Sequence, residues 1–443
     1  MAGELPSNDW RMVKLGDLGE VNRGRSRHRP RYAEHLYGGP YPFIQTGDIR
    51  LSGGRITKHT QTYSEAGLDQ SRLWPAGTMC ITIAANIAET AILSYPACFP
   101  DSVVGFIADE SKCDVRFVEY TFRHLRRRLQ HEATGSVQDN INLATLDRLV
   151  FPLPPLREQQ AIACILGALD DKIELNRRMN RTLEATARAI FKSWFVDFLP
   201  VRANMTRTQT GDPVRRNKDE GGRMKNEKGA RSSFIPHPSS FAALFPDAFE
   251  DSELGEIPKG WRVGRVADVA DVFSGKRPDV RYSEATEDAR IPLWGGNGPM
   301  AFVPEPLIDY PILLTGRVGT LGSVFRITSP CWPSDNTLIL RAKHEQAYEY
   351  LFLQLCRIDF SSLNRGSTQP LLTQTDLKAQ LLPLPPSGLL ERFHLIVDSL
   401  FLRFDSADIE SRTLAALRDA LLPKLISGEI RVKDAERVVG RAV

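Results

Sequence analysis

Phe151-Pro152-Leu153-Pro154-Pro155 and Leu382-Pro383-Leu384-Pro385-Pro386 are the two stretches that decide the fold of this chain. A long segment with helical periodicity of apolar residues follows each of them. The globular stretch before each also opens on a similar sequence, Trp10-Arg11-Met12-Val13 in the first case and Trp261-Arg262-Val263-Gly264 in the second. One large unit is therefore repeated twice, which predicts pseudo-two-fold symmetry within the chain. Such a protein suits a target that comes in two halves.

The composition is that of a globular protein. The chain has 443 residues, enough for two or three domains, and a net charge of only +3, so that local clusters must carry any argument for nucleic acid. Its cysteines form no CxxC pair and its histidines do not join them at metal-ligand spacing, which favours reduced thiols and no zinc site. No secretory leader and no apolar stretch of about 20 residues is present. We expect a soluble, cytoplasmic protein without a membrane partner.

Each copy of the repeat predicts a mixed α/β domain. Short β-rich runs alternate with glycine and proline, and a helix follows them. In the first copy the runs are Pro42–Gln45, Thr78–Ile83, Ala91–Tyr95 and Val103–Ile107, and the helix is Val115–Leu129. In the second copy the runs are Ile291–Trp294, Ile312–Thr315, Ser323–Ile327 and Thr337–Leu340, and the helix is Gln346–Arg357.

The segments after the proline motifs carry a heptad seam, the pattern of a coiled coil. In the first copy its positions are Ile162, Leu166, Leu169, Ile173, Asn176, Asn180, Leu183, Ala187, Ile190 and Trp194. In the second they are Phe393, Val397, Leu400, Phe404, Ala407, Ser411, Leu414, Arg418, Leu421 and Leu425. Both seams break to polar or small residues at the same place, and a polar layer fixes register at a cost in stability.

The shared register favours two helices that pack on each other as a rigid spacer of about 60 Å. The alternative is two separate amphipathic helices, each packed on its own domain. Pro423 should kink or end the second helix, since proline removes a backbone hydrogen bond. Outer apolar positions such as Phe191, Phe195 and Phe198 should be exposed when no partner covers them.

Between the copies, residues 203–232 are rich in Arg, Lys, Gly, Thr and Asn and almost free of aliphatic side chains. This composition predicts a solvated, disordered linker. The alternative is that its basic residues contact DNA phosphates.

Several catalytic signatures are missing from the sequence. It contains no GxxxxGK[ST] phosphate loop, no GxGxxG fingerprint at the start of a βα unit, no GxSxG elbow and no HExxH motif. The Asn-Pro-Pro-aromatic loop of amino-methyltransferases is also missing. Together these observations favour a binding protein over an enzyme.

The strongest positive signal is a run of alternate arginines at Arg23, Arg25, Arg27, Arg29 and Arg31, whose mutual repulsion an anion would relieve. The equivalent place in the second copy holds Lys276 and Arg277. Guanidinium groups pair with phosphates and, bidentately, with guanine O6 and N7, which favours DNA contact over a solvated charge run. For a further cluster on the first predicted helix, Arg123, Arg126, Arg127 and Arg128, a solvated face and phosphate contact remain equal alternatives.

Two polar loops recur before the spacer helices, Gly135–Asn140 and Gly366–Pro370. Glycine permits close approach to another backbone, and Ser, Thr, Gln and Asn side chains read base edges or bind phosphates. The predicted DNA contacts in these loops are Ser136, Gln138, Asn140, Ser367, Thr368 and Gln369. Weaker candidates, for which a structural turn is the alternative, are Thr46, Asn86, Asn297 and Arg317.

The chain resembles the specificity subunit of type I restriction–modification systems. The stretches that carry the resemblance are Phe151–Gln160, Trp194–Phe198, Phe245–Asp247 with Leu254–Trp261, and Leu421–Ile430. Together they are highly specific, and the likeness covers nearly the whole chain. The second proline motif departs from the pattern, because Leu390-Glu391 stands where the first copy has Gln159-Gln160.

The resemblance implies two target-recognition domains, 1–155 and 257–386, that each read half of a bipartite DNA site. It implies a central spacer helix at 156–200, a linker at 201–256, and a second spacer helix with a tail at 387–443, with the two helices antiparallel as a coiled coil. It also implies that two methyltransferase (modification) subunits dock on the helices, and through them the restriction motor–nuclease subunits. S-adenosylmethionine, ATP and magnesium would then belong to these partner chains.

The main hypothesis is therefore a non-catalytic DNA-recognition subunit. Two hypotheses from other classes remain open. One is a methyltransferase or nuclease with an unfamiliar site, which would modify or cut DNA alone. The other is a scaffold whose helices bind proteins and whose complex has no affinity for DNA.

Overall fold

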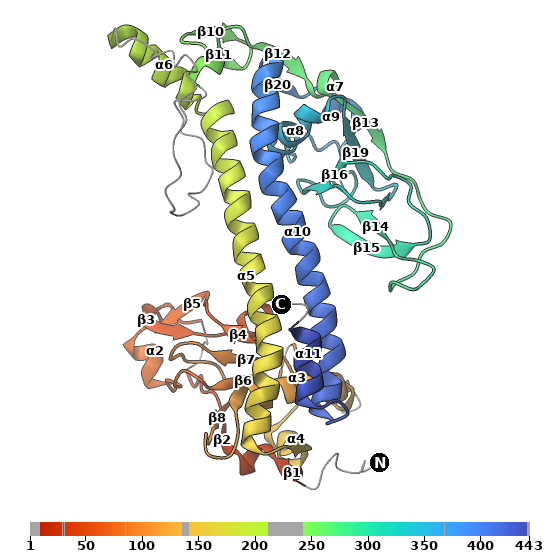
Figure 1. Ribbon diagram of the computed structural model, residues 1–443. Coiled ribbons are helices and arrows are strands. Elements are labelled where there is room, and N and C mark those ends of the chain that lie inside the picture. The colour runs from red at the N-terminus through yellow and green to blue at the C-terminus, as the bar shows by residue number, and fades with distance from the viewer. Residues whose placement is uncertain are drawn as a thin grey trace, which may run out of the picture. The chain divides into compact units, whose positions relative to one another are not determined.

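A computed structural model of the chain describes residues 9–28, 30, 32–84, 86–134, 141–210, 242–366 and 368–440. The chain forms two compact units (Figure 1). Unit 1 consists of Met1–Arg178 and Ala407–Val443, and unit 2 of Met179–Ser406. Two helices of 40 residues, α5 (Leu156–Phe195) and α10 (Ser387–Ile426), contribute to both units.

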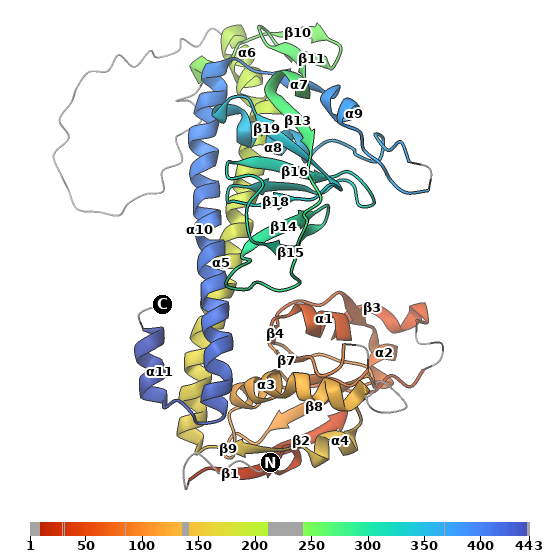
Figure 2. The same cartoon turned by 90° about the vertical axis from the view of Figure 1, so that its right-hand side faces the viewer.

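Unit 1 is built on a five-stranded sheet in the order β2 (Gly19–Arg23), β8 (Val103–Ala108), β6 (Met79–Thr82), β7 (Thr90–Leu93) and β4 (Arg55–Ile56). All neighbours are antiparallel except β4 and β7. One face of the sheet packs apolar side chains such as Ile81 and Phe106 against α3 (Val115–Thr134), which lies along it (Figure 2). The other face buries Cys80 and Val103 against Trp74 and Phe99.

Unit 2 repeats this arrangement with four strands in the order β13 (Ala270–Ser274), β19 (Thr337–Ala342), β16 (Ile312–Gly316) and β17 (Val324–Ile327), all antiparallel. Leu313 and Leu338 share one core cluster with α8 (Tyr348–Leu355), and Leu314 and Ile339 share another. The order matches β2-β8-β6-β7 of unit 1, so the predicted mixed α/β repeat is confirmed. The β-rich runs and the helix predicted in each copy all fall on elements of these domains.

In both units the opening sequence pairs with the proline motif. Strand β1 (Arg11–Lys14) is antiparallel to β9 (Val150–Leu153), and β12 (Arg262–Arg265) is antiparallel to β20 (Leu381–Leu384). After β9, the buried Gln159 side chain accepts from the amide of Asp114 at 3.0 Å and donates to the carbonyl of Pro154 at 2.8 Å. In the second copy Leu390 stands in place of this glutamine, and the Tyr350 hydroxyl donates to the carbonyl of Pro383, within β20.

Shorter elements complete each unit. In unit 1 they are η1 (Leu15–Asp17), η2 (Glu34–Leu36), β3 (Tyr37–Phe43), α1 (Thr46–Leu51), β5 (Gln61–Tyr63), α2 (Glu65–Asp69), α4 (Leu143–Arg148) and α11 (Val432–Val439). In unit 2 they are α6 (Leu199–Thr210), β10 (Phe249–Ser252), β11 (Gly255–Pro258), α7 (Val266–Val269), β14 (Ile291–Gly295), β15 (Gly298–Val303), β18 (Trp332–Pro333), η4 (Glu345–Ala347) and α9 (Gln374–Lys378).

Within each unit α5 and α10 run antiparallel, and their heptad positions are buried or half-buried. In unit 1 the Asn176 amide donates to Glu410 Oε2 at 2.7 Å and to the carbonyl of Ala407 at 3.4 Å. In unit 2 the Asn180 amide donates to the carbonyl of Phe404 at 3.2 Å. The helices also share a core with the domain of each unit. The two predicted arrangements therefore occur at the same time, because the helices pack on each other and also on the domains.

The prediction that Phe191, Phe195 and Phe198 are exposed is wrong. Phe191 and Phe195 are buried in unit 2, in an aromatic cluster with Tyr350 and Phe393, and Phe198 is half-buried against Trp261. The end of α5 thus forms part of the core of the second domain.

Two further expectations need correction. Helix α10 does not end at Pro423 but continues for three residues, to Ile426, since the loss of one backbone hydrogen bond is not enough to stop it there. The segment predicted to be disordered begins inside helix α6, and the β10–β11 hairpin follows C-terminal to that segment. The side chain of Asn204 in α6 donates to the carbonyls of Ala242 and Phe245 at 2.8 and 2.9 Å. Residues 211–241, which include most of the expected disordered segment, lie outside the described residues.

The cysteines behave mainly as small apolar side chains. Cys80, Cys98, Cys113 and Cys331 are buried, and burial raises the pKa of the Cys98 thiol to about 11 and that of Cys331 to about 12. Cys164 is exposed. Among the described residues, no helix combines the length with the apolar character that a membrane crossing requires.

Candidate nucleic-acid interface

The basic loop of unit 1 begins where β2 ends. The amide of Gly24 donates to the carbonyl of Val103 at 2.8 Å and that of Arg25 to the carbonyl of Phe99 at 3.2 Å. A Cβ atom on Gly24 would lie 2.3 Å from the carbonyl oxygen of Pro100, so only glycine fits this crossing. The crossing turns the side chains of Arg25 and Arg27 into solvent, whereas the Arg23 guanidinium donates to the carbonyl of Asp101 at 3.1 Å.

Unit 2 builds its basic loop in the same way after β13. The amide of Gly275 donates to the carbonyl of Thr337 at 3.2 Å and that of Lys276 to the carbonyl of Pro333 at 3.0 Å. A Cβ atom on Gly275 would lie 2.2 Å from the carbonyl oxygen of Ser334. Lys276 and Arg277 are exposed. Both basic loops therefore cross an equivalent Cys-aromatic-Pro segment, beginning at Cys98 in unit 1 and at Cys331 in unit 2.

The other unit 1 candidates lie around α1. Thr46 is the first residue of this helix and is half-buried. Asn86 has a positive φ of 56°, and its side chain accepts from Arg50 of α1 at 3.4 Å. The amide of Ile44 donates to the carbonyl of Cys98, and the amide of Arg25 in the basic loop donates to the carbonyl of the neighbouring Phe99. The α1 region and the basic loop are therefore both hydrogen-bonded to the same segment. Arg29, Arg31, Ser136, Gln138 and Asn140 lie outside the described residues, as does Ser367 of unit 2.

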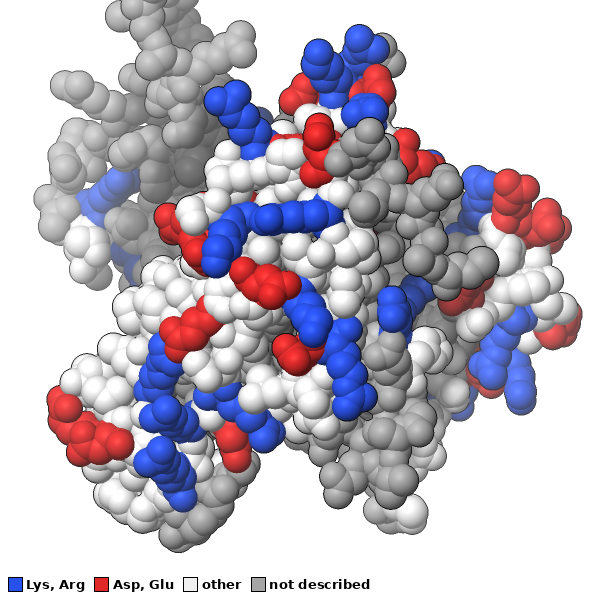
Figure 3. Space-filling view, turned by 90° about the horizontal axis from the view of Figure 1, so that it is seen from below, with Lys and Arg blue, Asp and Glu red and all other residues white. Residues whose placement is uncertain are grey.

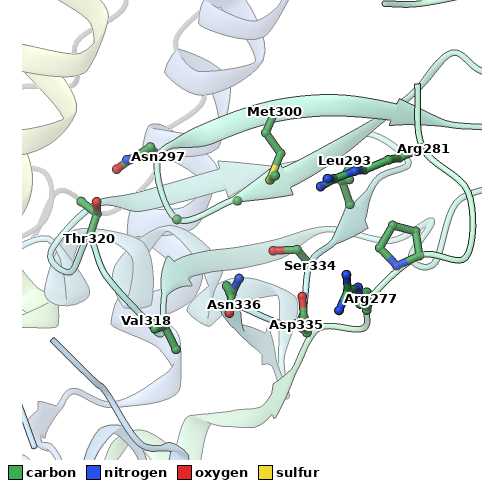
Figure 4. A pocket seen from close by; sticks show the side chains of 13 residues that line it. Arg277, Arg281, Leu293, Asn297, Met300, Val318, Thr320, Ser334, Asp335 and Asn336 are labelled. Atoms are coloured by element: carbon green, nitrogen blue, oxygen red, sulfur yellow. The ribbon is translucent and has the colours of Figure 1, made fainter. Parts of the chain in front are cut away.

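In unit 2 the candidates gather around a cavity of about 370 Å³ (Figure 4). Arg277, which the repeat indicated, and Asn297, one of the weaker candidates, both line it. The β14–β15 hairpin supplies Met300 from one side, and the segment from Ser334 to Asn336 supplies polar groups from another. The polar lining residues that the sequence analysis did not select are Arg281, Thr320, Ser334, Asp335 and Asn336. The last three of them follow Cys331-Trp332-Pro333, which matches Cys98-Phe99-Pro100 of the first copy, but this likeness does not show that they line a cavity.

Two more candidates lie next to this cavity. The amide of Arg317 donates to the carbonyl of Asn336 at 2.8 Å, and its guanidinium lies 3.5 Å from the hydroxyl of Ser274. The exposed side chain of Gln369 packs near Gly319, whose amide donates to the carbonyl of Pro370 at 3.0 Å. Thr368, beside Gln369, is also exposed.

The arginines of α3 have structural partners in unit 1. Arg123 pairs with Glu119 at 3.0 Å and with Asp170 of α5 at 3.1 Å, and Arg126 pairs with Glu89 at 2.9 Å. Burial raises the pKa of Glu119 despite the neighbouring Arg123. Of the two alternatives for this cluster, phosphate contact is therefore not favoured for Arg123 and Arg126.

The charge of the surface is mixed. On the face shown in Figure 3, groups of Lys and Arg side chains alternate with Asp and Glu side chains. This face therefore carries no uniform basic field for a polyanion.

Comparison with known proteins identifies the family. A family model described as the type I restriction modification DNA specificity domain matches residues 7–185 and 258–417. The chain belongs to this family. Its two matched regions correspond to the two copies of the repeat, and the chain is a specificity subunit of a type I restriction–modification system.

Two named relatives of this specificity subunit match along most of their length. The MjaIX specificity subunit of Methanocaldococcus jannaschii is 28% identical, with 98% of this chain and 96% of the relative covered. The HindI specificity subunit of Haemophilus influenzae is 27% identical over 68% of this chain and 73% of its own length. The crystal structure of the S subunit from M. genitalium shares the fold, with a TM-score of 0.57, 17% identity, and 95% and 97% of the two chains covered.

Proposed function

We propose that this chain reads a bipartite double-stranded DNA site, with the domain of each unit bound to one half of it. The observation that carries the proposal is the equivalent placement of the two basic loops. In both units a glycine crossing supports exposed basic side chains beside the same Cys-aromatic-Pro segment. Since the loops differ in sequence while their supports agree, the two half-sites should differ in sequence.

The proposal includes partner subunits, which supply the chemistry. Two methyltransferase subunits bind the helices, and restriction motor–nuclease subunits join through them. This chain performs no catalysis, and S-adenosylmethionine, ATP and magnesium bind the partners.

Exposed apolar side chains on the helices support the docking of partners. In unit 2, helix α10 exposes Leu395 and Leu402 at heptad spacing, each with an exposed fraction of 57%, and in unit 1 it exposes Ile409, at 62%. Helix α5 exposes Leu175 and Met179. Large apolar side chains grouped on one surface mark binding sites for other proteins.

Footprinting of the complex reconstituted with its modification subunit tests the proposal. We expect two short protected segments with an unprotected gap between them, and an affinity that falls steeply with salt concentration because basic side chains displace counterions. Protection of one continuous short site would contradict the bipartite model. DNA methylation or cleavage by the purified chain alone would contradict a non-catalytic role.

A further inference from the structure

The cavity of unit 2 is an open surface cavity with charged side chains at its rim. Its lining comes from three separate stretches, 277–300, 318–320 and 334–336. The backbone crossing at its edge is too tight for a side chain, because a Cβ atom on Gly316 would lie 2.0 Å from the carbonyl oxygen of Thr320. A volume of about 370 Å³ lies within the range of about 300–1,000 Å³ typical of ligand pockets.

The charged side chains that line this cavity have no charged or hydrogen-bonding partner among the described residues. In the part of the chain that the structure describes, Arg277, Arg281 and Asp335 form neither an ion pair nor a side-chain hydrogen bond. Two arginines of unit 2 outside the cavity do have carboxylate partners, since Arg326 pairs with Asp405 at 2.6 Å and Arg365 pairs with Asp376 at 2.8 Å. The cavity thus holds charged donors and a charged acceptor that are not joined to each other.

Both arginines stand on anchored backbone. Arg277 follows the Gly275 crossing, where the amide of Lys276 donates to the carbonyl of Pro333. Arg281 precedes Tyr282, whose amide donates to the carbonyl of Phe302 at 2.9 Å and whose carbonyl accepts from the amide of Phe302 at 2.8 Å. Leu293, Met300 and Val318 supply apolar walls, which strengthen any hydrogen bond formed beside them.

This set of groups matches one base pair better than the others. A guanine–cytosine pair presents two acceptors, guanine O6 and N7, next to one donor, cytosine N4. Arginine is the usual donor to the first two, and an acidic side chain accepts from the third. A phosphate fits the cavity less well, because Asp335 repels it. An adenine–thymine pair has no second purine acceptor for a bidentate guanidinium.

We propose that the unit 2 cavity reads one guanine–cytosine pair of its half-site, with Arg277 and Arg281 supplying donors to guanine and Asp335 accepting from cytosine N4. This inference rests on the proposed function and adds the identity of one base pair and the residues that select it.

Modification patterns of cells that carry the full complex test the inference. Arg277→Ala, Arg281→Ala and Asp335→Asn are compared with wild type. Each is tested on a set of DNA sites that differ from the recognition site of the wild type at a single base pair. The preference for the correct base pair over a substituted one should fall by about 10- to 100-fold at one guanine–cytosine position of a single half-site. We expect this for Asp335→Asn and for at least one of the arginine variants. The other half-site should be read as before.

Arg262→Ala is the matched control, because it removes the same charge from an exposed position on β12 outside the cavity. Unchanged discrimination in all three cavity variants, or an effect at an adenine–thymine position, overturns the inference. So does an equal weakening on every sequence, which is the signature of phosphate contacts. If wild type itself has no sequence preference, the proposed function fails as well. The near-isosteric Asp335→Asn, at an exposed position, separates readout from folding.

Discussion

At the scale of single residues, Asp170 of α5 joins three helices of unit 1. Its carboxylate accepts from Arg123 of α3 at 3.1 Å, from Arg418 of α10 at 2.6 Å and from the Tyr120 hydroxyl at 2.8 Å. Burial alone would raise the pKa of Asp170, but the two arginines and Tyr120 outweigh burial and hold this pKa below its usual value. The folded domain therefore depends on the ionised carboxylate.

Asp170→Asn should lower the free energy of unfolding of unit 1 by about 1–3 kcal/mol, because two largely buried guanidinium groups lose a shared carboxylate while each keeps a second one, Glu119 for Arg123 and Asp419 for Arg418. Denaturant unfolding of the purified chain measures this loss. Asp171→Asn is the neighbouring control, since its ion pair with Arg55 is exposed and should contribute less than about 1 kcal/mol. The depressed pKa also means that this stabilisation is present above pH 3.8 and is lost as the pH falls through the folded value. Equal losses of unfolding free energy in the Asp170 and Asp171 variants would contradict the stabilising role of the Asp170 carboxylate.

Glu349 of α8 shows the opposite shift. Burial raises its pKa, although His394 of α10 lies 2.6 Å away and works in the other direction. A raised carboxyl pKa favours folding below pH 4.5, and this contribution is lost as the pH rises through the folded value. Glu349→Gln should therefore show a smaller decrease in unfolding free energy than wild type as the pH rises from about 4.5. The exposed Glu345→Gln serves as control and should keep the wild-type dependence.

At the scale of elements, α10 has two apolar faces with different roles. One includes Phe393, Val397 and Phe401 and is buried in unit 2. The other exposes Leu395 and Leu402. A helix of a protein that works alone would carry polar residues on that second face.

Leu402→Lys should weaken binding of the modification subunit by at least tenfold, because a charge would have to be buried at the interface. Thermal unfolding of the isolated chain should stay near wild type, since Leu402 is 57% exposed. Affinity measured by titration with the purified modification subunit tests this. Leu254→Lys places the same charge on an exposed leucine between β10 and β11 and should leave the affinity unchanged. Full affinity of Leu402→Lys would place the docking surface elsewhere.

The sequence predicted elements better than it predicted the site. Strands β6, β8, β16 and β19 are apolar runs bounded by glycine or proline and were recognised, whereas β2 reads Gly-Glu-Val-Asn-Arg and carries no such pattern. Lys276 and Arg277 were found through the repeat. Arg281 and Asp335 were missed because only the folded chain brings them to one cavity. The burial of Phe195 was missed because a heptad seam does not reveal which domain covers its other face.

At the scale of the whole molecule, duplication with divergence is the main feature. The two domains have equivalent backbone scaffolds. They share the strand order, the pairing of β1 with β9 or of β12 with β20, and the glycine crossings. The exposed loop residues differ. Recognition can therefore change in one domain while the other stays constant.

Arg25→Ala combined with Arg27→Ala should weaken DNA binding by the assembled complex on all sequences. If both side chains contact phosphates, the slope of log affinity against log salt should decrease in magnitude by about 2, at roughly 0.9 per contact. Titrations at several salt concentrations measure the slope. Arg262→Ala should leave the slope unchanged. An unchanged slope in the double variant would exclude phosphate contact by this loop.

The division of unit 1 into two chain segments has a consequence for its biosynthesis. Leu414, Leu421 and Leu425 belong to its core, yet they leave the ribosome after all of unit 2, which is one continuous stretch. At about 5–20 residues per second, the first domain waits on the order of tens of seconds for these side chains. The domain that is translated first is thus the one completed last, and until then its apolar surface is open to chaperones.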